Sequence, residues 1–340
     1  MKSVILLVFL TSFAVAQNRI YRIEINGVIN PASAEYIGKA IETAQDNHAQ
    51  CLVIELDTPG GLMKSMQIIV KGILASEIPV VVYVSPGGSH CASAGVFIMM
   101  ASHIAAMAPG TNVGAAHPVN LGGGGADSLS QVMSAKVTND AVAYIRSIAE
   151  KNGRNADWAE EAVRQSVSIT ETVALQKNVI TMIAKNFDSL LVKIDSLQVE
   201  TVVGKKVIRT TNAVVEKIQR GWRFDLLDIL TDPNIAYILM MLGIYGLFFE
   251  LYNPGSVVPG VVGVICLILA FYSFQTLPIN YAGLALIIFG VILFLLEIKI
   301  TSYGILSIGG IVALFLGSVM LINSPEEMMR ISWTVIAPVV

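Results

Sequence analysis

The sequence predicts an α/β domain followed by an all-α bundle of transmembrane helices. Strand-like and helix-like patterns alternate over roughly the first 200 residues, and long apolar runs follow Pro233. The chain has 340 residues, 54% of them hydrophobic and 14% charged, and its mean hydropathy is +0.67. This is too apolar for an all-soluble protein, and almost all of the excess lies after Pro233.

The N-terminus has the three-part pattern of a secretory signal peptide over residues 1–16. Lys2 precedes an apolar run, and the small residues Ala14 and Ala16 mark a cleavage site that would leave Gln17 as the first residue. The alternative is an uncleaved anchor helix, but the run is short of the ~20 residues that span a bilayer. Either way, we expect the following domain to be exported.

The domain at 17–203 begins with alternating strands and helices. Apolar residues alternate with polar ones from Tyr21 to Ile25, which predicts a half-buried strand. Asn30 and Pro31 then provide an N-cap and a first-turn proline for a helix. The pattern recurs as strands over 51–56 and 80–84 and helices over 62–74 and 92–102. Such alternation indicates a largely parallel sheet.

The second half of this domain contains a glycine-rich segment, and a connector follows. Four consecutive glycines at 122–125 predict a mobile loop over 120–130, because glycines lose much backbone freedom on ordering. A helix over 129–151 follows, with an apolar stripe that packs on one face. Residues 204–232 are interpreted as a polar, partly amphipathic connector that leads to the membrane.

The region at 233–340 contains four apolar segments, each near the length that crosses the hydrocarbon core. They lie at about 234–252, 257–275, 279–297 and 303–322. Residues 331–340 begin a fifth. If the preceding domain is exported, the first segment runs from outside to inside. Lys299 then lies on the cytoplasmic side, as the positive-inside rule prefers.

Two loops in the first domain have the composition of a catalytic site. Residues 57–61 read Asp-Thr-Pro-Gly-Gly between a strand and a helix, so the amides of Gly60 and Gly61 are exposed as candidate oxyanion-hole donors. Ser93 lies in Cys-Ala-Ser-Ala-Gly, also between strand and helix, where its hydroxyl is a candidate nucleophile and the Ala94 amide completes the hole. Either motif alone more often marks an ordinary helix start.

Together and in this order, the motifs resemble the NfeD family of membrane-bound serine proteases, of the ClpP class. The resemblance implies a ClpP/crotonase-like spiral domain and a membrane-anchored serine endopeptidase with a Ser-Lys dyad. It also implies substrates with hydrophobic segments, a stomatin-like membrane protein as substrate or partner, and a homo-oligomer. The matching segments are 56–61, 92–95, 108–111, 114–118, 153–155, 158–160, 232–233, 242–243, 254–255 and 259–260.

Two residues compete as the base that activates Ser93. By resemblance the base is a lysine on the helix after the glycine loop, which matches Lys136. A lysine acts in this way only where apolar surroundings lower its pKa from ~10.4 toward neutrality. The alternative without a catalytic role is that Lys136 is exposed and forms an ion pair with Asp140 on the same helix. The rival base is His117, in a context like that of the ClpP catalytic histidine, since imidazole titrates near neutral pH.

Other classes of function are less consistent with the sequence. The net charge of −3 and the absence of Lys/Arg clusters argue against nucleic acid. Four histidines and three cysteines without ligand spacing predict no metal and no cofactor. A non-catalytic scaffold for a stomatin-like assembly is the main alternative. A crotonase-like acyl-CoA enzyme does not suit an exported domain, and a transporter does not suit spans whose acids, Glu250 and Glu297, lie at helix ends.

The family commonly ends in a small β-barrel domain of the OB type, and none follows the apolar segments here. Because the fifth apolar segment at 331–340 stops soon after it begins, we expect this sequence to be a fragment of a longer protein. The expected location is the cell membrane, multi-pass, with the peptidase-like domain outside the cytoplasm.

Overall fold

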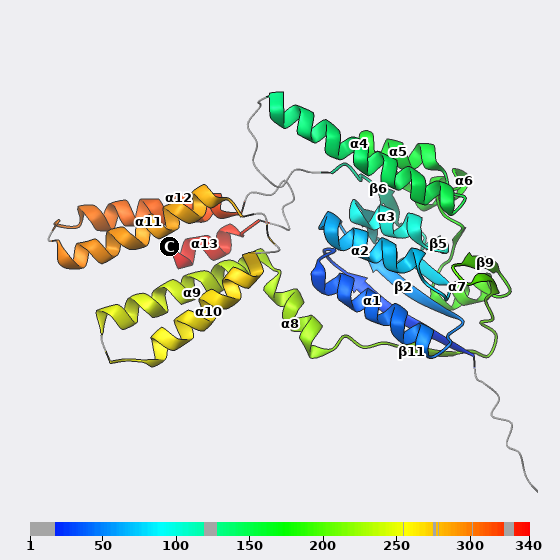
Figure 1. Cartoon of the computed structure of the whole chain (residues 1–340), viewed down its shortest axis with the longest axis horizontal. Helices are drawn as coiled ribbons and strands as arrows, with labels where there is room; N and C mark the ends of the chain where they lie inside the picture. Colours follow the sequence, from blue (N-terminus) through cyan, green and yellow to red (C-terminus); the bar gives the residue numbers. More distant parts are fainter. Residues whose placement is uncertain are drawn as a thin grey trace, which may run out of the picture.

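The computed structural model describes residues 18–118, 128–253, 255–274, 277, 279–300, 302–322 and 330–340. The predicted signal peptide and most of the predicted loop at 120–130 lie outside the described residues. The described chain forms an α/β region followed by a helical region (Figure 1). This confirms the predicted fold class.

A six-stranded, all-parallel sheet forms the centre of the α/β region, in the order β11-β1-β2-β3-β5-β8. The sheet includes the predicted strands, and its register pairs Ile20 with Cys51 and Asn26 with Asp57. β2 and β3 are buried almost throughout, as expected for inner strands of a parallel sheet. The strands are β1 Arg19–Asn26, β2 Cys51–Asp57, β3 Val80–Val84, β5 Ile104–Met107, β8 Met182–Ile183 and β11 Val214–Lys217.

Helices cover both faces of this sheet. One core lies between the sheet and helices that include α1 Pro31–Asp46, α2 Met63–Leu74 and α3 Ala94–Ala101. A second, smaller core on the other face contains residues of α7 Phe187–Ile194. Asn30 caps α1 as predicted, because its side chain accepts a hydrogen bond from the Ser33 amide in a reciprocal capping box.

The remaining elements between β3 and β8 include three helices and a small sheet. Figure 1 shows α4 and α5 beyond α3, on the side away from α1. A small separate sheet has the order β4-β6-β7. These elements are α4 Ser128–Lys151, α5 Ala156–Arg164, α6 Glu171–Gln176, β4 His90–Ala92, β6 Asn112–Gly114 and β7 Ser168–Thr170.

The segment expected to be a connector, 204–232, is more structured than the sequence suggested. β10 Gly204–Val207 forms a hairpin with β9 Gln198–Thr201. β11 joins the edge of the main sheet, where Val214 pairs with Arg19. Only α8 Trp222–Leu230 then leads to the helical region. The short edge strand β11 has no fully buried residue, so it lacks the apolar pattern that identified the inner strands.

The helical region contains apolar helices at the four predicted positions. By length and composition, α9 Pro233–Tyr252 and α11 Tyr281–Lys299 can cross a membrane, being 20 and 19 residues long. α10 Val258–Phe274 and α12 Ile305–Leu321 are apolar but shorter, at 17 residues each. α13 Trp333–Val339 packs back against α9, where Tyr245 bonds to the Val339 carbonyl.

The apolar helices form two hairpins of the same design, α9–α10 and α11–α12. Gly243, Glu250, Gly263 and Leu267 of the first recur, at one constant spacing, as Gly290, Glu297, Gly310 and Leu314 of the second. A Cβ atom added to either first glycine would lie 2.9 Å from the carbonyl oxygen of Gly263 or Gly310 in the partner helix. Glycine therefore allows close backbone approach in both hairpins, as small residues do between membrane helices.

His103 makes the stability of the folded chain sensitive to pH. Its Nδ1 accepts a hydrogen bond of 3.1 Å from the Val80 amide. Burial, with a smaller effect of the Arg154 charge, lowers the pKa of His103 from 6.5 to about 4. Between these values the unfolded chain binds the extra proton, so the free energy of unfolding rises with pH from about 4 to 6.5. We expect His103 to contribute on the order of 3 kcal/mol to this rise.

Urea denaturation of the full chain in detergent at several pH values measures this slope. His103→Gln, which keeps an acceptor for Val80 but does not titrate, should flatten the stability profile in that interval. An equal slope in the variant and the parent would contradict the assignment.

Candidate active site

Backbone hydrogen bonds hold the Pro-Gly-Gly loop and the serine turn side by side. The Thr58 amide donates to the His90 carbonyl (2.8 Å), and the Ala92 amide donates to the Thr58 carbonyl (3.0 Å). The carboxylate of Asp57 accepts from the His90 amide (2.9 Å). The end of β2 and the strand β4 are therefore joined immediately before the residues of chemical interest.

Gly60 lies directly against Ser93. A Cβ atom on Gly60 would collide with Cβ of Ser93 and would lie 2.9 Å from its Oγ. Gly60 also has a φ of +125°, which side chains rarely adopt. Its amide donates to Oγ1 of Thr58 (3.0 Å), so this amide is already used. Glycine at this position is needed for both its conformation and its lack of a side chain.

Ser93 occupies a strained turn between β4 and α3. Its φ is 50° and its ψ is −115°, a region that a serine occupies only at an energetic cost. Its amide points to the Gly114 and Ala115 carbonyls at 3.3 and 3.2 Å. The side chain is half-buried, and its hydroxyl has no hydrogen-bond partner among the described residues. A comparable strand-turn-helix presents the nucleophilic serine in α/β-hydrolases.

Two of the three candidate oxyanion donors have amides available. Within the described chain, neither the Gly61 nor the Ala94 amide donates a hydrogen bond to another group. Gly61 is fixed beside Ile29, since the Ile29 amide donates to the Gly60 carbonyl (2.7 Å) and the Leu62 amide to the Ile29 carbonyl (2.8 Å). The two joined loops thus carry a free hydroxyl and two free amides, which are groups that acyl transfer uses.

The structure does not bring Lys136 to Ser93. Lys136 is exposed on α4, and in the described part of the chain it makes no hydrogen bond with Ser93 and no ion pair with Asp140. Figure 1 shows the N-terminal half of α4 extending beyond α3. Val132 and Met133 in this half are 70% and 57% exposed, which is high for apolar side chains.

His117 also lies without contact to Ser93 among the described residues. Its Nδ1 is 2.9 Å from the Val163 carbonyl of α5. Because a carbonyl only accepts, Nδ1 carries the proton in this contact and Nε2 is the free nitrogen. The ring is half-buried, so this bond fixes the segment after β6 against α5.

Arg154 supports the site in a way that our sequence analysis did not assign. Its nearly buried guanidinium donates to the carbonyls of Met100 (2.9 Å) and Ser102 (2.7 Å) at the C-terminal end of α3. Burial lowers its pKa to about 10. A cation at this end is favourable for the helix that begins after Ser93. Its place in the Gly-Arg-Asn match at 153–155 was the available signal.

Two protein-family models together match most of the chain. Residues 19–201 match the model of the NfeD1b N-terminal domain. Residues 234–340 match the NfeD integral membrane domain. The chain belongs to the NfeD family. Within the described residues of this NfeD-family chain, no group of three or more His, Cys, Asp or Glu side chains is placed to hold a metal ion.

Two relatives extend over most of the sequence. Membrane-bound protease PH1510 of Pyrococcus horikoshii is 37% identical over 327 residues, which cover 96% of this chain and 74% of the relative. Membrane protein NfeD1b of Bacillus subtilis is 30% identical over 316 residues, covering 88% of this chain and 67% of the relative. The similarity to the first relative supports the interpretation of this chain as a membrane protease.

Solved structures of the 1510-N membrane-bound stomatin-specific protease are also similar. A variant with a serine replaced by alanine is 36% identical with a TM-score of 0.55, covering 60% of this chain and 99% of that one. A variant with a lysine replaced by alanine, in complex with a substrate peptide, is 35% identical with a TM-score of 0.58 and covers 64% and 100%. A third structure is described as specific for a stomatin homolog from Pyrococcus horikoshii.

Proposed function

We propose that this NfeD-family chain is a membrane-anchored serine endopeptidase with Ser93 as its nucleophile and Lys136 as its base. The observation that carries the proposal is the position of Ser93. Its free hydroxyl lies on a strained turn against Gly60, and the unpartnered amides of Gly61 and Ala94 belong to the same two joined loops. Strain retained at such a turn is typical of functional sites.

In the proposed reaction, Oγ of Ser93 attacks the scissile carbonyl, and the Gly61 and Ala94 amides bind the resulting oxyanion. The uncharged amine of Lys136 takes the hydroxyl proton and later gives it to the leaving amine. Because Lys136 is exposed in this structure, the proposal requires its approach to Ser93 when substrate binds. Catalytic hydrogen bonds commonly tighten only in the substrate complex.

We further propose that the substrates are polypeptides with hydrophobic segments, including stomatin-like membrane proteins. The similarity to the stomatin-specific 1510-N protease supports this class. The proposed arrangement has α9–α12 crossing the cell membrane, the catalytic domain outside the cytoplasm and the enzyme acting as a homo-oligomer. The apolar helices and the match to the NfeD integral membrane domain support the membrane anchor.

A fluorophosphonate probe tests the nucleophile independently of substrate choice. The Ser93 oxygen should displace fluoride from phosphorus and leave a stable phosphonylated serine in the full chain in detergent. Ser93→Ala should remove the label. The matched control is Ser166→Ala, since Ser166 is exposed and also has a positive φ, of 55°; its variant should label like the parent. A parent chain without label would favour the non-catalytic scaffold.

A further inference from the structure

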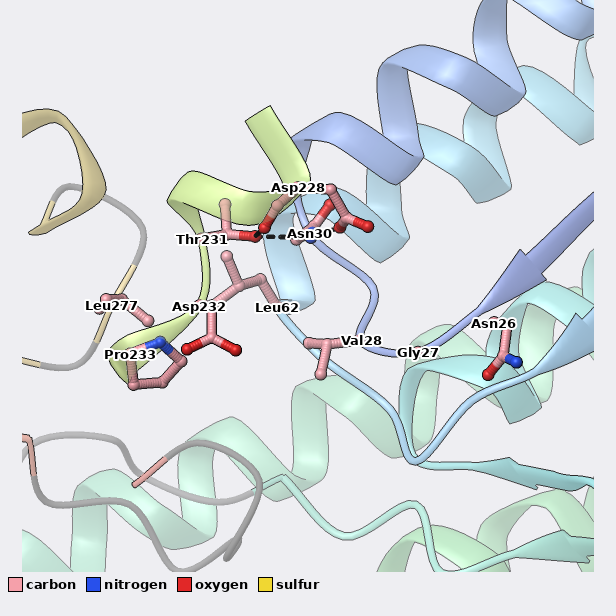
Figure 2. Close-up of a pocket in the computed structure, with 10 residues that line it drawn as sticks. All are labelled: Asn26, Gly27, Val28, Asn30, Leu62, Asp228, Thr231, Asp232, Pro233 and Leu277. Atoms are coloured by element: carbon pink, nitrogen blue, oxygen red, sulfur yellow. Dashed lines mark hydrogen bonds between the residues drawn. The ribbon is translucent and has the colours of Figure 1, made fainter. Parts of the chain in front are cut away.

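A cavity of about 200 Å³ lies where the α/β region meets the helical region. Its walls come from the loop after β1, the residue before α2, the junction of α8 and α9, and Leu277 between α10 and α11 (Figure 2). Val28, Leu62 and Pro233 belong to the first three of these walls. The cavity therefore lies between the α/β region and the first residue of the candidate membrane span α9.

Four polar side chains of the lining, those of Asn30, Asp228, Thr231 and Asp232, already make hydrogen bonds. Nδ2 of Asn30 donates to Oδ1 of Asp228 and to Oγ1 of Thr231, each at 2.9 Å (Figure 2). The other carboxylate oxygen of Asp228 accepts from Arg220 (3.2 Å). Oδ1 of Asp232 caps α9 by accepting from the Asn234 amide (2.7 Å). The apolar part of the lining consists of Val28, Leu62, Pro233 and Leu277, and Asn26 adds a further polar side chain.

The apolar walls lie directly beside the candidate oxyanion loop. The Ile29 backbone amide and carbonyl form hydrogen bonds with Gly60 and Leu62, the residues on either side of Gly61. Val28 precedes Ile29 and Leu62 follows Gly61, and both side chains line the cavity. The cavity wall thus begins one residue from the Gly61 amide. A subsite here requires that a peptide bound at the Gly61 amide extends along the loop toward Leu62.

We infer that this junctional cavity is a subsite for one apolar side chain of the polypeptide substrate, close to the cleaved bond. This inference rests on the proposed peptidase function. A cavity of about 150 Å³ lined by apolar side chains holds benzene, so a leucine or phenylalanine side chain suits this volume. Because Pro233 begins α9, the subsite accepts a residue at the membrane end of the enzyme, where a hydrophobic segment emerges.

The same walls exclude acidic residues. The Asp228 and Asp232 carboxylates lie at the cavity, and a substrate carboxylate placed there would lose water and meet like charge. The subsite should therefore prefer leucine or phenylalanine over alanine and should reject aspartate. One methylene group in an apolar pocket changes kcat/KM by about 10- to 200-fold, which sets the scale of this preference.

The test is cleavage of a peptide series by the full chain in detergent, with each position around the cleaved bond occupied in turn by Leu, Phe, Ala or Asp. Val28→Phe fills the cavity and should reduce the Leu-over-Ala ratio of kcat/KM about 10- to 100-fold at one position only. A general structural defect would lower all peptides together and leave this ratio unchanged. The matched control is Val192→Phe, since Val192 is 77% exposed on α7; it should keep the parent ratio.

A second variant covers the possibility that Val28→Phe does not fold. Leu62→Ala enlarges the cavity and should shift the preference at the same position from Leu toward Phe. Fluorophosphonate labelling of Ser93 in each sample separates the two proposals. An unlabelled and inactive parent defeats the peptidase function itself. A labelled, active enzyme whose preference is unchanged by both variants overturns the subsite alone.

Discussion

Replacing Ser93 by alanine is expected to abolish peptide cleavage, and replacing Lys136 by alanine should be nearly as damaging. The two residues act as one catalytic unit in the proposed mechanism, so loss of either removes the activated nucleophile. In a serine protease analysed in this way, loss of the nucleophile costs on the order of 10⁶-fold in kcat. The measurement is kcat/KM of the full chain on a hydrophobic peptide. The double variant should be no worse than Ser93→Ala.

His117→Ala distinguishes the two candidate bases. The His117 ring bonds to the Val163 carbonyl, so its loss should loosen the segment after β6 but leave most of the activity. A folded but inactive His117→Ala together with an active Lys136→Ala would identify the histidine as the base. Activity in all three single variants would defeat the serine peptidase.

Gly60→Ala should lower kcat/KM by about 10²-fold or more, because the new methyl group would displace the Ser93 side chain. Misplacing a catalytic group by about 1 Å has an effect of this size. The positive φ of residue 60 adds a loss of folding stability of about 1–3 kcal/mol. Both quantities are measurable on the same preparation, by peptide cleavage and by denaturant unfolding.

Gly204→Ala is the matched control for this substitution. Gly204 has a similar φ of +108°, but its added Cβ atom would meet nothing within 4 Å, and it lies in the β9–β10 hairpin. This variant should lose comparable stability and keep the parent activity. Equal activity losses in the two variants would show that strain, rather than contact with Ser93, causes the effect.

Elements with strong local signals were predicted well from the sequence. Asn30 and Pro31 indicated the start of α1, and the structure shows the complete capping box there. The apolar run at 80–84 is β3 with the same bounds. β11 was missed because an edge strand need not be apolar, and its place beside β1 depends on pairing between distant segments. Local patterns do not encode such pairings.

In the candidate site, too, local motifs were informative, whereas contacts between distant segments could not be predicted. The two loop motifs indicated the two segments that the structure places side by side, with Gly60 against Ser93. The separate roles of Gly60 and Gly61 were not predictable, because they depend on whether Thr58 uses the amide. The distance from Lys136 to Ser93 depends on how α4 packs. Helix periodicity places Lys136 on α4 but does not determine that packing.

The paired design of the apolar helices has a consequence for the parity of membrane crossings. In the proposed arrangement, each hairpin returns the chain to the compartment from which it entered. A chain with one, two or three such hairpins makes an even number of crossings, so duplicating a hairpin is topologically neutral, whereas gaining a single helix inverts everything downstream. The recurrence of Gly243 and Glu250 as Gly290 and Glu297 is what duplication of a whole hairpin would leave. The segment after Leu321 then starts from the same compartment as Ser93.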